Sequence, residues 1–242
     1  MNEQKERGVS AAQNSFRTAE VFVRDDLKLH TVPVTGLGRP DIPEDMRVRW
    51  QSSLSLFTPV LGICSGTIMR VRDNGVEVFL RSGEPLPAYT AGAFFPFNTR
   101  SYCENAIGLN RFVIMDISEE QHAPGSPVCY CGIPLRWEDG SFFGTLCLFS
   151  RDCQFKEDDV HPPLSELASS IEKDLELLYR RQGWSEENDR YAKAMEAVLQ
   201  YSPGGIFSYS AEEDEQFSYI SDNMLAFLGY TLDAFVRKFA NR

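Results

Sequence analysis

Cysteine is the residue type in this chain best suited to chemistry, because a thiolate is both a nucleophile and a metal ligand. The N-terminus lacks an apolar signal segment, so reduced thiols are expected, most of them small core residues. A Cys-x-Cys pair in a strand points its two sulfurs to opposite faces, which disfavours a shared metal ion. The six cysteines are Cys64, Cys103, Cys129, Cys131, Cys147 and Cys153.

Histidine and glycine patterns give no metal or phosphate site. His30, His122 and His161 lie in separate segments and form no evident tetrahedral set. The glycines at 36 and 38 follow no clear strand–helix unit, so they do not form a phosphate-binding loop. We therefore predict no metal site, and the sequence leaves any cofactor unknown.

The net charge of −11 and the pI near 4.8 disfavour nonspecific binding to nucleic acid or to an anionic membrane, since both need a positive field. The sequence contains no run of about 18 apolar residues of the kind that spans a bilayer. We therefore expect a cytoplasmic chain with no nucleic-acid or membrane partner.

The candidate thiols need a scaffold, and the segment 128–150 predicts its centre. Asp139-Gly140 joins two apolar runs and is a strong hairpin signal. The second run is apolar on both faces, which is typical of a strand covered on both sides. One face is predicted to carry Phe143, Thr145, Cys147 and Phe149, and the other Phe142, Gly144, Leu146 and Leu148.

Helical stripes supply the predicted covering layers. Met46, Trp50, Leu54, Phe57 and Leu61 recur at helical spacing after Pro43. A short helix is expected over 99–106, with Thr99 as its cap. A third helix is expected to start near Pro162 and to be interrupted at Gly183. Its seam, which suits either the sheet or a partner helix, consists of Leu164, Ala168, Ile171, Leu175 and Leu178.

Glycine- and proline-rich breaks and changes in the hydrophobic pattern divide the sequence into four predicted segments. Residues 1–42 are interpreted as an arm or tail, although 19–23 could form a short strand. Residues 43–182 form the main domain, with a hairpin over 67–81 and an aromatic loop over 82–97 that caps a cavity. Residues 183–203 are a helical linker. Residues 204–242 contain two short strands and two short helices, too few to bury an adequate core alone.

Residues 43–182 resemble a GAF domain. The matching pieces are Ser101-Tyr102-Cys103-Glu104, Phe112 to Asp116, Gly132 to Trp137, and Gly144 to Cys147. The resemblance implies an α+β fold. A central antiparallel sheet carries helices on one face, and pocket-forming loops with a short helix lie on the other.

The C-terminal segment resembles the beginning of a PAS domain. The matching residues are Gly204 to Phe207, Phe217 to Asn223, and Leu228 to Tyr230. Together the two resemblances imply a sensory module of a bacterial signalling protein. Its output, which would be cyclic-di-GMP turnover or a kinase, is not in these residues, so the chain as given is expected not to be an enzyme.

The resemblance places a small-molecule pocket on one face of the sheet, and aromatic residues there would favour a planar or apolar ligand. The expected ligand-binding residues are Phe97, Ser101, Tyr102, Cys103, Asn105, Asp116, Tyr130, Thr145 and Cys147. The resemblance also implies a homodimer through the Leu164–Leu178 seam and the helix near Pro43.

Two other functions stay open on the sequence. The first is a cysteine-dependent reductase similar to the GAF-fold free methionine sulfoxide reductases, in which Cys103 would react. The second is a ligand-free dimerisation domain with a filled core. A bilin photoreceptor is disfavoured, because Cys103 is followed by Glu104 instead of histidine.

Overall fold

The computed structural model describes residues 17–35, 39–60, 63–120, 126–153, 156–201, 205–209 and 217–239. The chain divides into two compact units, Met1–Arg180 (unit 1) and Arg181–Arg242 (unit 2). Each unit is described by itself below. Among the described helices, none is both long and apolar enough to cross a membrane.

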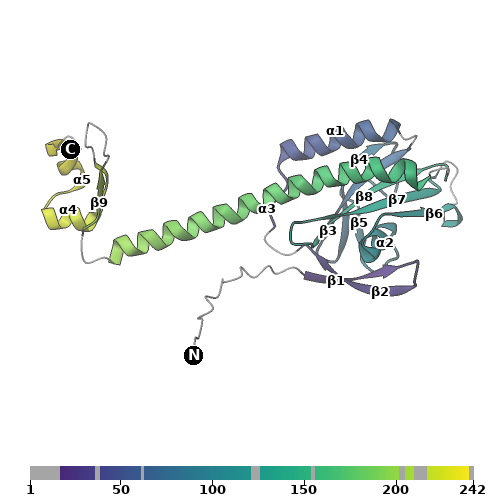
Figure 1. Ribbon diagram of the computed structural model, residues 1–242, viewed down its shortest axis with the longest axis horizontal. Coiled ribbons are helices and arrows are strands. Elements are labelled where there is room, and N and C mark those ends of the chain that lie inside the picture. Colours follow the sequence, from purple (N-terminus) through teal and green to yellow (C-terminus); the bar gives the residue numbers. More distant parts are fainter. Residues whose placement is uncertain are drawn as a thin grey trace, which may run out of the picture. The chain divides into compact units, whose positions relative to one another are not determined.

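Unit 1 is built around one mostly antiparallel sheet of eight strands (Figure 1). The strands are β1 (Arg17–Val23), β2 (Lys28–Val34), β3 (Ser65–Arg72), β4 (Gly75–Gly83), β5 (Phe94–Pro96), β6 (Val113–Asp116), β7 (Cys129–Arg136) and β8 (Phe142–Ser150). The helices are α1 (Glu44–Val60), α2 (Tyr102–Leu109), the 3-10 turn η1 (Ser118–Glu120) and α3 (Glu157–Tyr201), which continues into unit 2.

The central strand is β8. It pairs antiparallel with β3 on one side and with β7 on the other, and it meets β2 in parallel only at Val34 and Phe142. Because both neighbours run along it, β8 is buried at every position. The predicted doubly covered central strand is therefore confirmed.

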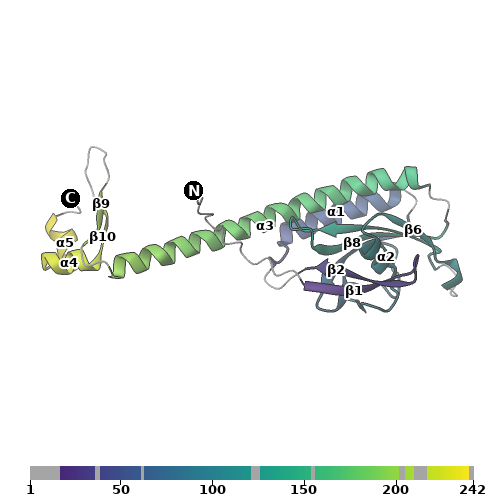
Figure 2. The ribbon, with the colours of Figure 1, turned by 60° about the horizontal axis from the view of Figure 1, so that its bottom comes forward.

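Two layers cover the sheet. Helices α1 and α3 lie side by side on one face, where Trp50 Nε1 of α1 donates to Asp174 Oδ2 of α3 at 2.7 Å (Figures 1 and 2). Helix α2 and the β1–β2 hairpin lie on the other face. This arrangement confirms the α+β, GAF-like fold class.

A β-bulge in β8 places two of its residues on the faces opposite to those predicted. Leu135 pairs with Gly144 but Arg136 pairs with Phe142, so β8 has one extra residue at Phe143. Phe143 consequently packs toward α1 and α3, whereas Phe142 packs toward α2 with Cys147. The sequence pattern had assigned these two phenylalanines to the opposite faces.

The N-terminal segment also differs from the prediction. Residues 17–34 form the β1–β2 hairpin, and Val21, Val23 and Val34 are fully buried. A Cβ added at Gly108 of α2 would collide with Val23, so helix and hairpin are in close contact. The described part of the predicted arm therefore belongs to the body of unit 1.

Helix α3 starts earlier and runs further than predicted. It begins at Glu157, so Pro162 and Pro163 lie within its second turn instead of starting it. It continues through Gly183, which does not adopt a positive φ. A glycine costs a helix only about 1 kcal/mol relative to alanine, so it weakens the helix without ending it.

The predicted dimer seam of α3 is buried within a single chain. Its side chains pack against the sheet and are at most 7% exposed. A second copy would therefore gain no area by contacting them, so this part of the predicted interface is wrong. The other part, the helix near Pro43, stays a prediction. Whether the chain dimerises stays a prediction. The residues concerned are Leu164, Ala168, Ile171, Leu175 and Leu178.

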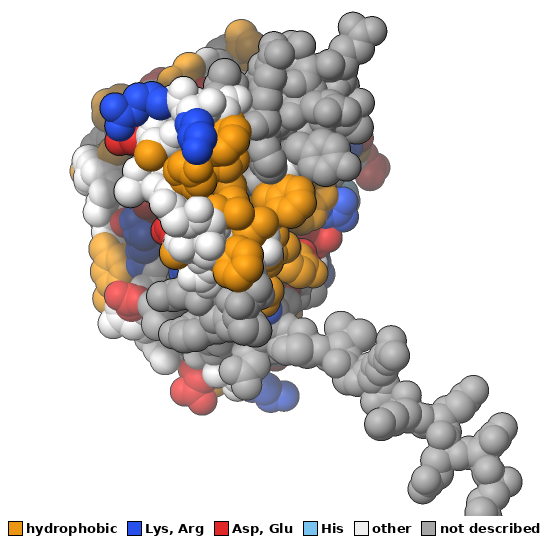
Figure 3. Space-filling view, turned by 90° about the vertical axis from the view of Figure 1, so that its left-hand side faces the viewer, with side chains coloured by type: hydrophobic (Ala, Val, Ile, Leu, Met, Phe, Trp, Pro, Cys, Tyr) orange, Lys and Arg blue, Asp and Glu red, His pale blue; other side chains and the backbone are white. Residues whose placement is uncertain are grey.

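Beyond the end of α3, unit 2 contains the elements expected from the sequence. They are β9 (Phe207–Tyr209), β10 (Phe217–Ile220), α4 (Asp222–Leu228) and α5 (Leu232–Phe239), and the two strands pair antiparallel. Figure 3 shows hydrophobic side chains gathered on one side of this unit. Beyond α3, the exposed large hydrophobic residues of its described part are Phe207, Tyr219, Phe227, Leu228, Leu232, Val236 and Phe239.

Candidate functional site

The face of the sheet under α2 brings two thiols and three hydroxyls together. Thr67 of β3 pairs directly with Cys147 of β8, and Thr145 lies two residues before Cys147, so all three side chains share one face. On the other side of Cys147 the pairing residue is Gly132 of β7. A Cβ at Gly132 would collide with the Tyr130 hydroxyl, so this glycine lets Tyr130 reach over to Cys147.

The sulfur of Cys147 is the centre of this thiol cluster, which consists of Thr67, Cys103, Tyr130, Thr145 and Cys147. Thr145 Oγ1 lies 3.1 Å and the Tyr130 hydroxyl 3.2 Å from Cys147 Sγ. Cys103 Sγ, carried by α2, lies 3.7 Å from Cys147 Sγ. All five residues are at most 2% exposed.

The cluster favours ionisation of one thiol over the other. Burial alone would raise the pKa of Cys147, but hydrogen bonds from Cys103, Thr145 and Tyr130 outweigh burial and lower that pKa. The pKa of Cys103 is raised well above its usual value, because its hydrogen bond to Cys147 and its own burial both hold the proton. Of the two thiols, Cys147 is therefore the one that ionises more readily, and Cys103 holds its proton more firmly.

Thr67 supplies an independent sign that the cluster stabilises negative charge. Its Oγ1 is buried and has no hydrogen-bond partner within the described part of the chain. The hydroxyl lies close enough to Cys147 to lower the pKa of that thiol. An unpaired buried hydroxyl costs stability, and a thiolate at Cys147 would provide it with an acceptor.

Aromatic rings cover the cluster. The ring of Tyr89 stacks on Phe95 at 5.0 Å and lies 4.6 Å from Phe149, and the ring of Tyr102 lies 5.4 Å from Tyr130. The segment 82–97, which includes β5, thus covers the cluster, but it lies over packed side chains and not over the predicted cavity; Phe94 of β5 is 44% exposed. The cap closes over packed side chains at this position.

Glu104 fixes α2, and with it Cys103, in place. Its fully buried carboxylate accepts hydrogen bonds from the backbone N–H groups of Phe22 (2.8 Å), Asn98 (2.8 Å) and Ser101 (2.9 Å). Ser101 is therefore the N-cap of α2 and forms a capping box with Glu104. The predicted cap at Thr99 is wrong, because Thr99 instead donates to Pro96 O.

Four of the nine predicted ligand-binding residues, Cys103, Tyr130, Thr145 and Cys147, meet in the cluster, and Tyr102 lies beside them. The other four serve different contacts. Ser101 caps α2, Asn105 Oδ1 accepts from the backbone N–H of Arg24, Phe97 is half-buried against the core, and Asp116 is exposed and accepts from Ser118 N. Sequence reasoning missed the roles of Thr67 and Glu104, and it placed Tyr89 only in the covering aromatic loop. Glu104 did leave a signal, the Ser-x-x-Glu capping pattern.

The other thiols do not contribute to this site. Cys131 faces the α1–α3 side, where burial raises its pKa to about 12. Cys129 and Cys153 form a disulfide, which corrects the expectation that these thiols are reduced. The pairing joins β7 to the segment after β8, where the two Cα atoms lie 5.1 Å apart.

Metal binding finds no support in the described residues, which contain no group of three or more His, Cys, Asp or Glu side chains able to hold an ion. His30 Nε2 lies 2.7 Å from Asp26, and the His161 ring lies 4.7 Å from the ring of Phe112. His122 lies outside the described residues.

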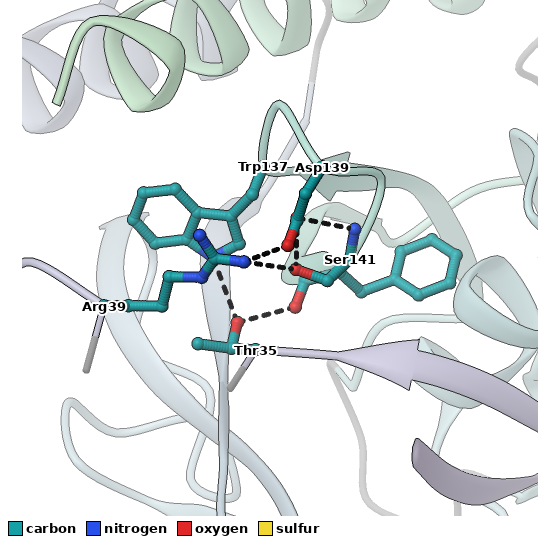
Figure 4. Close-up of polar contacts among 6 residues, drawn as sticks. Thr35, Arg39, Trp137, Asp139 and Ser141 are labelled. Atoms are coloured by element: carbon teal, nitrogen blue, oxygen red, sulfur yellow. Dashed lines mark hydrogen bonds and ion pairs between the residues drawn. The ribbon is translucent and has the colours of Figure 1, made fainter. Parts of the chain in front are cut away.

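A second polar site lies at the β7–β8 turn (Figure 4). Arg39 forms an almost fully buried ion pair with Asp139, and its guanidinium lies over the Trp137 ring at 5.4 Å. Trp137 Nε1 donates to Thr35 Oγ1 at 3.1 Å, and Ser141 Oγ donates to Asp139 Oδ1 at 2.8 Å. These contacts fasten the segment after β2 to the turn.

The cavity beside this ion pair has a volume of about 230 Å³ and is lined by four arginines. Each arginine already has a carboxylate partner. Arg17 pairs with Asp73 and Arg39 pairs with Asp139. Arg70 and Arg72 share Glu77. These three carboxylates, together with Asp41 in the same lining, offset the charge of the four arginines, so little net positive charge is left to hold an anion.

Comparisons with known proteins find the fold but no family. No family model matches the sequence, and no curated protein matches it. Among solved structures, a free methionine-R-sulfoxide reductase from Neisseria meningitidis is 21% identical, with a TM-score of 0.43 over 61% of this chain and 98% of that one. A GAF domain region from Geobacter sulfurreducens is 20% identical, with a TM-score of 0.43 over 52% and 93%. A type II free methionine-R-sulfoxide reductase from Thermoplasma acidophilum is 15% identical, with a TM-score of 0.46 over 56% and 96%.

The presence of enzymes among these structures corrects one expectation from the sequence. The chain was expected not to be an enzyme, but free methionine-R-sulfoxide reductases occur beside GAF domains among the matches. The fold therefore gives no ground for excluding catalysis. Likenesses this distant concern the fold alone and do not assign an activity to this chain.

Proposed function

We propose that this chain is a GAF-type sensory module of a signalling protein, and that it senses oxidation of the Cys103–Cys147 thiol pair. One observation carries the proposal: two buried thiols lie 3.7 Å apart, surrounded by hydroxyls that favour the thiolate of Cys147. A disulfide formed there would tie α2 to the central strand of the sheet. Oxidation would thus change how firmly the two layers are joined.

The chemistry needs a peroxide as oxidant. The Cys147 thiolate attacks one peroxide oxygen, the O–O bond breaks, and the leaving oxygen takes a proton to become water or an alcohol. Cys103 then attacks the sulfur of the resulting sulfenic acid, the S–O bond breaks, and a second water leaves with the Cys103 proton. Two thiols and one peroxide give one disulfide, so the atoms and electrons balance.

The full burial of the pair favours a sensor that responds slowly. Buried thiols react only when the structure opens locally, and the covering Tyr89–Phe95 segment carries half-exposed and exposed residues. The predicted planar ligand has less support, because aromatic and thiol side chains occupy the face expected to hold it.

A reductase is the second candidate, because the same pair could reduce a sulfoxide. The Cys147 thiolate would attack the sulfoxide sulfur, its S–O bond would break as the oxygen passes to Cys147 as a sulfenic acid, and the sulfide would leave. Cys103 would then attack the Cys147 sulfur, form the disulfide and release the oxygen as water. The depressed pKa of Cys147 suits a nucleophile. A sulfoxide, however, needs space beside Cys147, and the packed side chains there leave that requirement unmet.

Peptide mapping after peroxide treatment tests the sensor. The full chain is oxidised, its free thiols are alkylated, and its disulfides are located by mass spectrometry. We expect a new link between Cys103 and Cys147, with a formation rate that rises with pH and reaches half its maximum below the ordinary thiol value of 9.0. The matched control is Cys131→Ser, which removes a buried thiol on the opposite face and should leave the link unchanged.

Single variants separate the two roles. Cys103→Ser should leave a sulfenic acid on Cys147 that a dimedone reagent traps, whereas Cys147→Ser should leave Cys103 unreacted. The sensor proposal fails if peroxide modifies other cysteines while this pair stays reduced. Multiple turnovers of free methionine sulfoxide with a dithiol reductant, lost in Cys147→Ser, would instead establish the reductase.

A further inference from the structure

A row of side chains crosses the sheet at the thiol cluster. Cys147 of β8 pairs with Thr67 of β3, and Thr67 pairs with Arg81 of β4. Residues that pair directly across antiparallel strands point their side chains to the same face of the sheet. Cys147, Thr67 and Arg81 therefore follow one another on the face covered by α2, and Thr67 lies between the thiol and the guanidinium.

Arg81 adds to this row a hydrogen-bond donor that has no acceptor. Its Nε is buried and has no partner within the described part of the chain, and the same holds for Thr67 Oγ1. Nη2 of Arg81 reaches the carbonyl oxygen of Gly83 at 3.5 Å, which is long for a hydrogen bond. Buried polar groups in folded proteins are nearly always paired, so two unpaired groups on neighbouring residues indicate a place where a ligand atom binds.

The positive charge of Arg81 is also available to a ligand. Each of the four arginines in the cavity beside the β7–β8 turn has a carboxylate partner. Arg81, by contrast, forms no ion pair with any carboxylate that the structure describes. An oxygen atom that carries negative charge would therefore meet a cation that no carboxylate has already bound, and a charge-assisted hydrogen bond of this kind is a strong one.

The sheet holds the row in place. Helix α1 fixes β4 at this position, because Gln51 Nε2 donates to the backbone oxygen of Arg81 at 2.6 Å. Thr67 and Cys147 are fully buried on paired strands. When the covering Tyr89–Phe95 segment opens to admit an oxidant, these strands keep their pairing, so the three side chains of the row stay next to one another.

We propose that Arg81 is a catalytic residue of the peroxide reaction, and that its Nε donates a hydrogen bond to the oxygen that leaves. This inference rests on the proposed function. In that reaction the Cys147 thiolate attacks one peroxide oxygen, an S–O bond forms, the O–O bond breaks, and its electron pair goes to the second oxygen.

The direction of the row suits this displacement. Sulfur, attacked oxygen and leaving oxygen lie close to one line when the O–O bond breaks. The row extends from the Cys147 sulfur past Thr67 to Arg81. A peroxide aligned with the row therefore has its leaving oxygen beside the two groups that lack a partner.

The negative charge moves toward the same two groups. Before the attack it lies on Cys147 Sγ, where the Thr67 hydroxyl is close enough to stabilise it. During the attack it passes to the leaving oxygen, which departs as hydroxide or alkoxide and takes a proton from the solvent. Arg81 Nε has no partner at the start, so its bond to this oxygen forms only as the charge develops. An interaction made only in the transition state lowers the barrier to reaction.

Two reagents separate this role from a general effect on the thiol. Peptide mapping of the full chain gives the rate constants of Cys147 with hydrogen peroxide and with iodoacetamide. Both reactions need the Cys147 thiolate and an open cover, but only the peroxide releases a strongly basic oxygen, since iodide is a poor hydrogen-bond acceptor. The ratio of the peroxide rate constant to the alkylation rate constant therefore reports on the leaving oxygen.

We expect Arg81→Gln to lower this ratio about 100-fold, the loss typical of removing one donor to a developing oxyanion. Arg81→Lys keeps the charge but not the planar donor, so the ratio should fall by about 10-fold. The matched control is Arg72→Gln, which removes an arginine from the opposite face of the sheet and should leave the ratio unchanged. Circular dichroism verifies the fold of each variant, and Arg81→Lys decides the question if Arg81→Gln is unfolded.

The inference and the proposed function fail in different ways. A parent chain in which peroxide leaves Cys103 and Cys147 reduced refutes the sensor, and the inference with it. A parent that forms the Cys103–Cys147 link, with an unchanged ratio in both Arg81 variants, overturns the inference alone, because Arg81 Nε then bonds to a buried water only. An equal fall of the ratio in Arg72→Gln also overturns it, because the effect then comes from net charge.

Discussion

Replacing Glu104 with glutamine should weaken unit 1 strongly, because this buried carboxylate joins three segments. Oε2 accepts from the N–H groups of Phe22 and Asn98, and Oε1 accepts from the N–H and hydroxyl of Ser101. In Glu104→Gln the amide NH2 is best placed at the Oε1 position, where the Ser101 hydroxyl can turn to accept from it. The Ser101 N–H then loses its acceptor.

The magnitude follows from these contacts. An unsatisfied buried donor costs about 1–3 kcal/mol. The two bonds to Phe22 and Asn98 change from charged to neutral acceptors, and each loses roughly 1 kcal/mol. We therefore expect the free energy of unfolding to fall by about 3–5 kcal/mol, which corresponds to a melting temperature roughly 10 °C lower for a domain of this size.

Urea titration followed by near-ultraviolet circular dichroism measures this loss. The control is Glu20→Gln on the exposed side of β1, which should change the free energy of unfolding by less than about 0.5 kcal/mol. Alkylation of Cys103 under native conditions should also accelerate in Glu104→Gln, because α2 is held less firmly. A loss below about 1 kcal/mol would show that Glu104 does not join these segments as described.

Three further predictions concern the same unit. Asp139→Asn should lower the free energy of unfolding by about 3 kcal/mol at pH 7 by leaving Arg39 unpaired. Burial alone would raise the pKa of Asp139, but hydrogen bonds from Ser141 and the charge of Arg39 lower it. The difference in the free energy of unfolding between the parent and Asp139→Asn should therefore disappear as the pH falls below 3.8 and through the folded pKa. Acid titrations of the parent and the variant measure this difference. Reduction of the Cys129–Cys153 disulfide, whose cysteines are 24 residues apart, should lower the free energy of unfolding by about 3 kcal/mol. Dithiothreitol should therefore lower the urea midpoint of the parent but not that of Cys153→Ser. Gly144→Ala should prevent soluble expression or lower the melting temperature, because a Cβ there would collide with the backbone carbonyl of β3, whereas Gly140→Ala at the open turn should be milder.

The sequence predicted the layers better than the details of the sheet. Apolar runs on both faces of β8 correctly indicated a covered central strand. The bulge at Phe143 could not be predicted, because positions 142 and 143 are both phenylalanine and either side chain suits either face of the sheet. The β1–β2 hairpin was missed because Pro33 and several exposed positions weaken its strand pattern. Its burial depends on contacts with α2 far along the chain.

The candidate site shows the same division between local and long-range information. Cys103, Tyr130, Thr145 and Cys147 were predicted to lie near one another because the resemblance to a GAF domain placed their segments around one pocket. Thr67 carried no such signal, because its place opposite Cys147 depends on the register between β3 and β8. Register is set by pairing across 80 residues and cannot be determined from either strand alone.

Helix α3 illustrates why a correct pattern can lead to a wrong interface. The seam of Leu164 to Leu178 has the spacing of a coiled coil, but the same spacing suits a helix lying on a sheet. The structure assigns that seam to the sheet, since its residues are buried in a single chain. The period of a heptad pattern therefore indicates an apolar helix face, but it does not identify what covers that face.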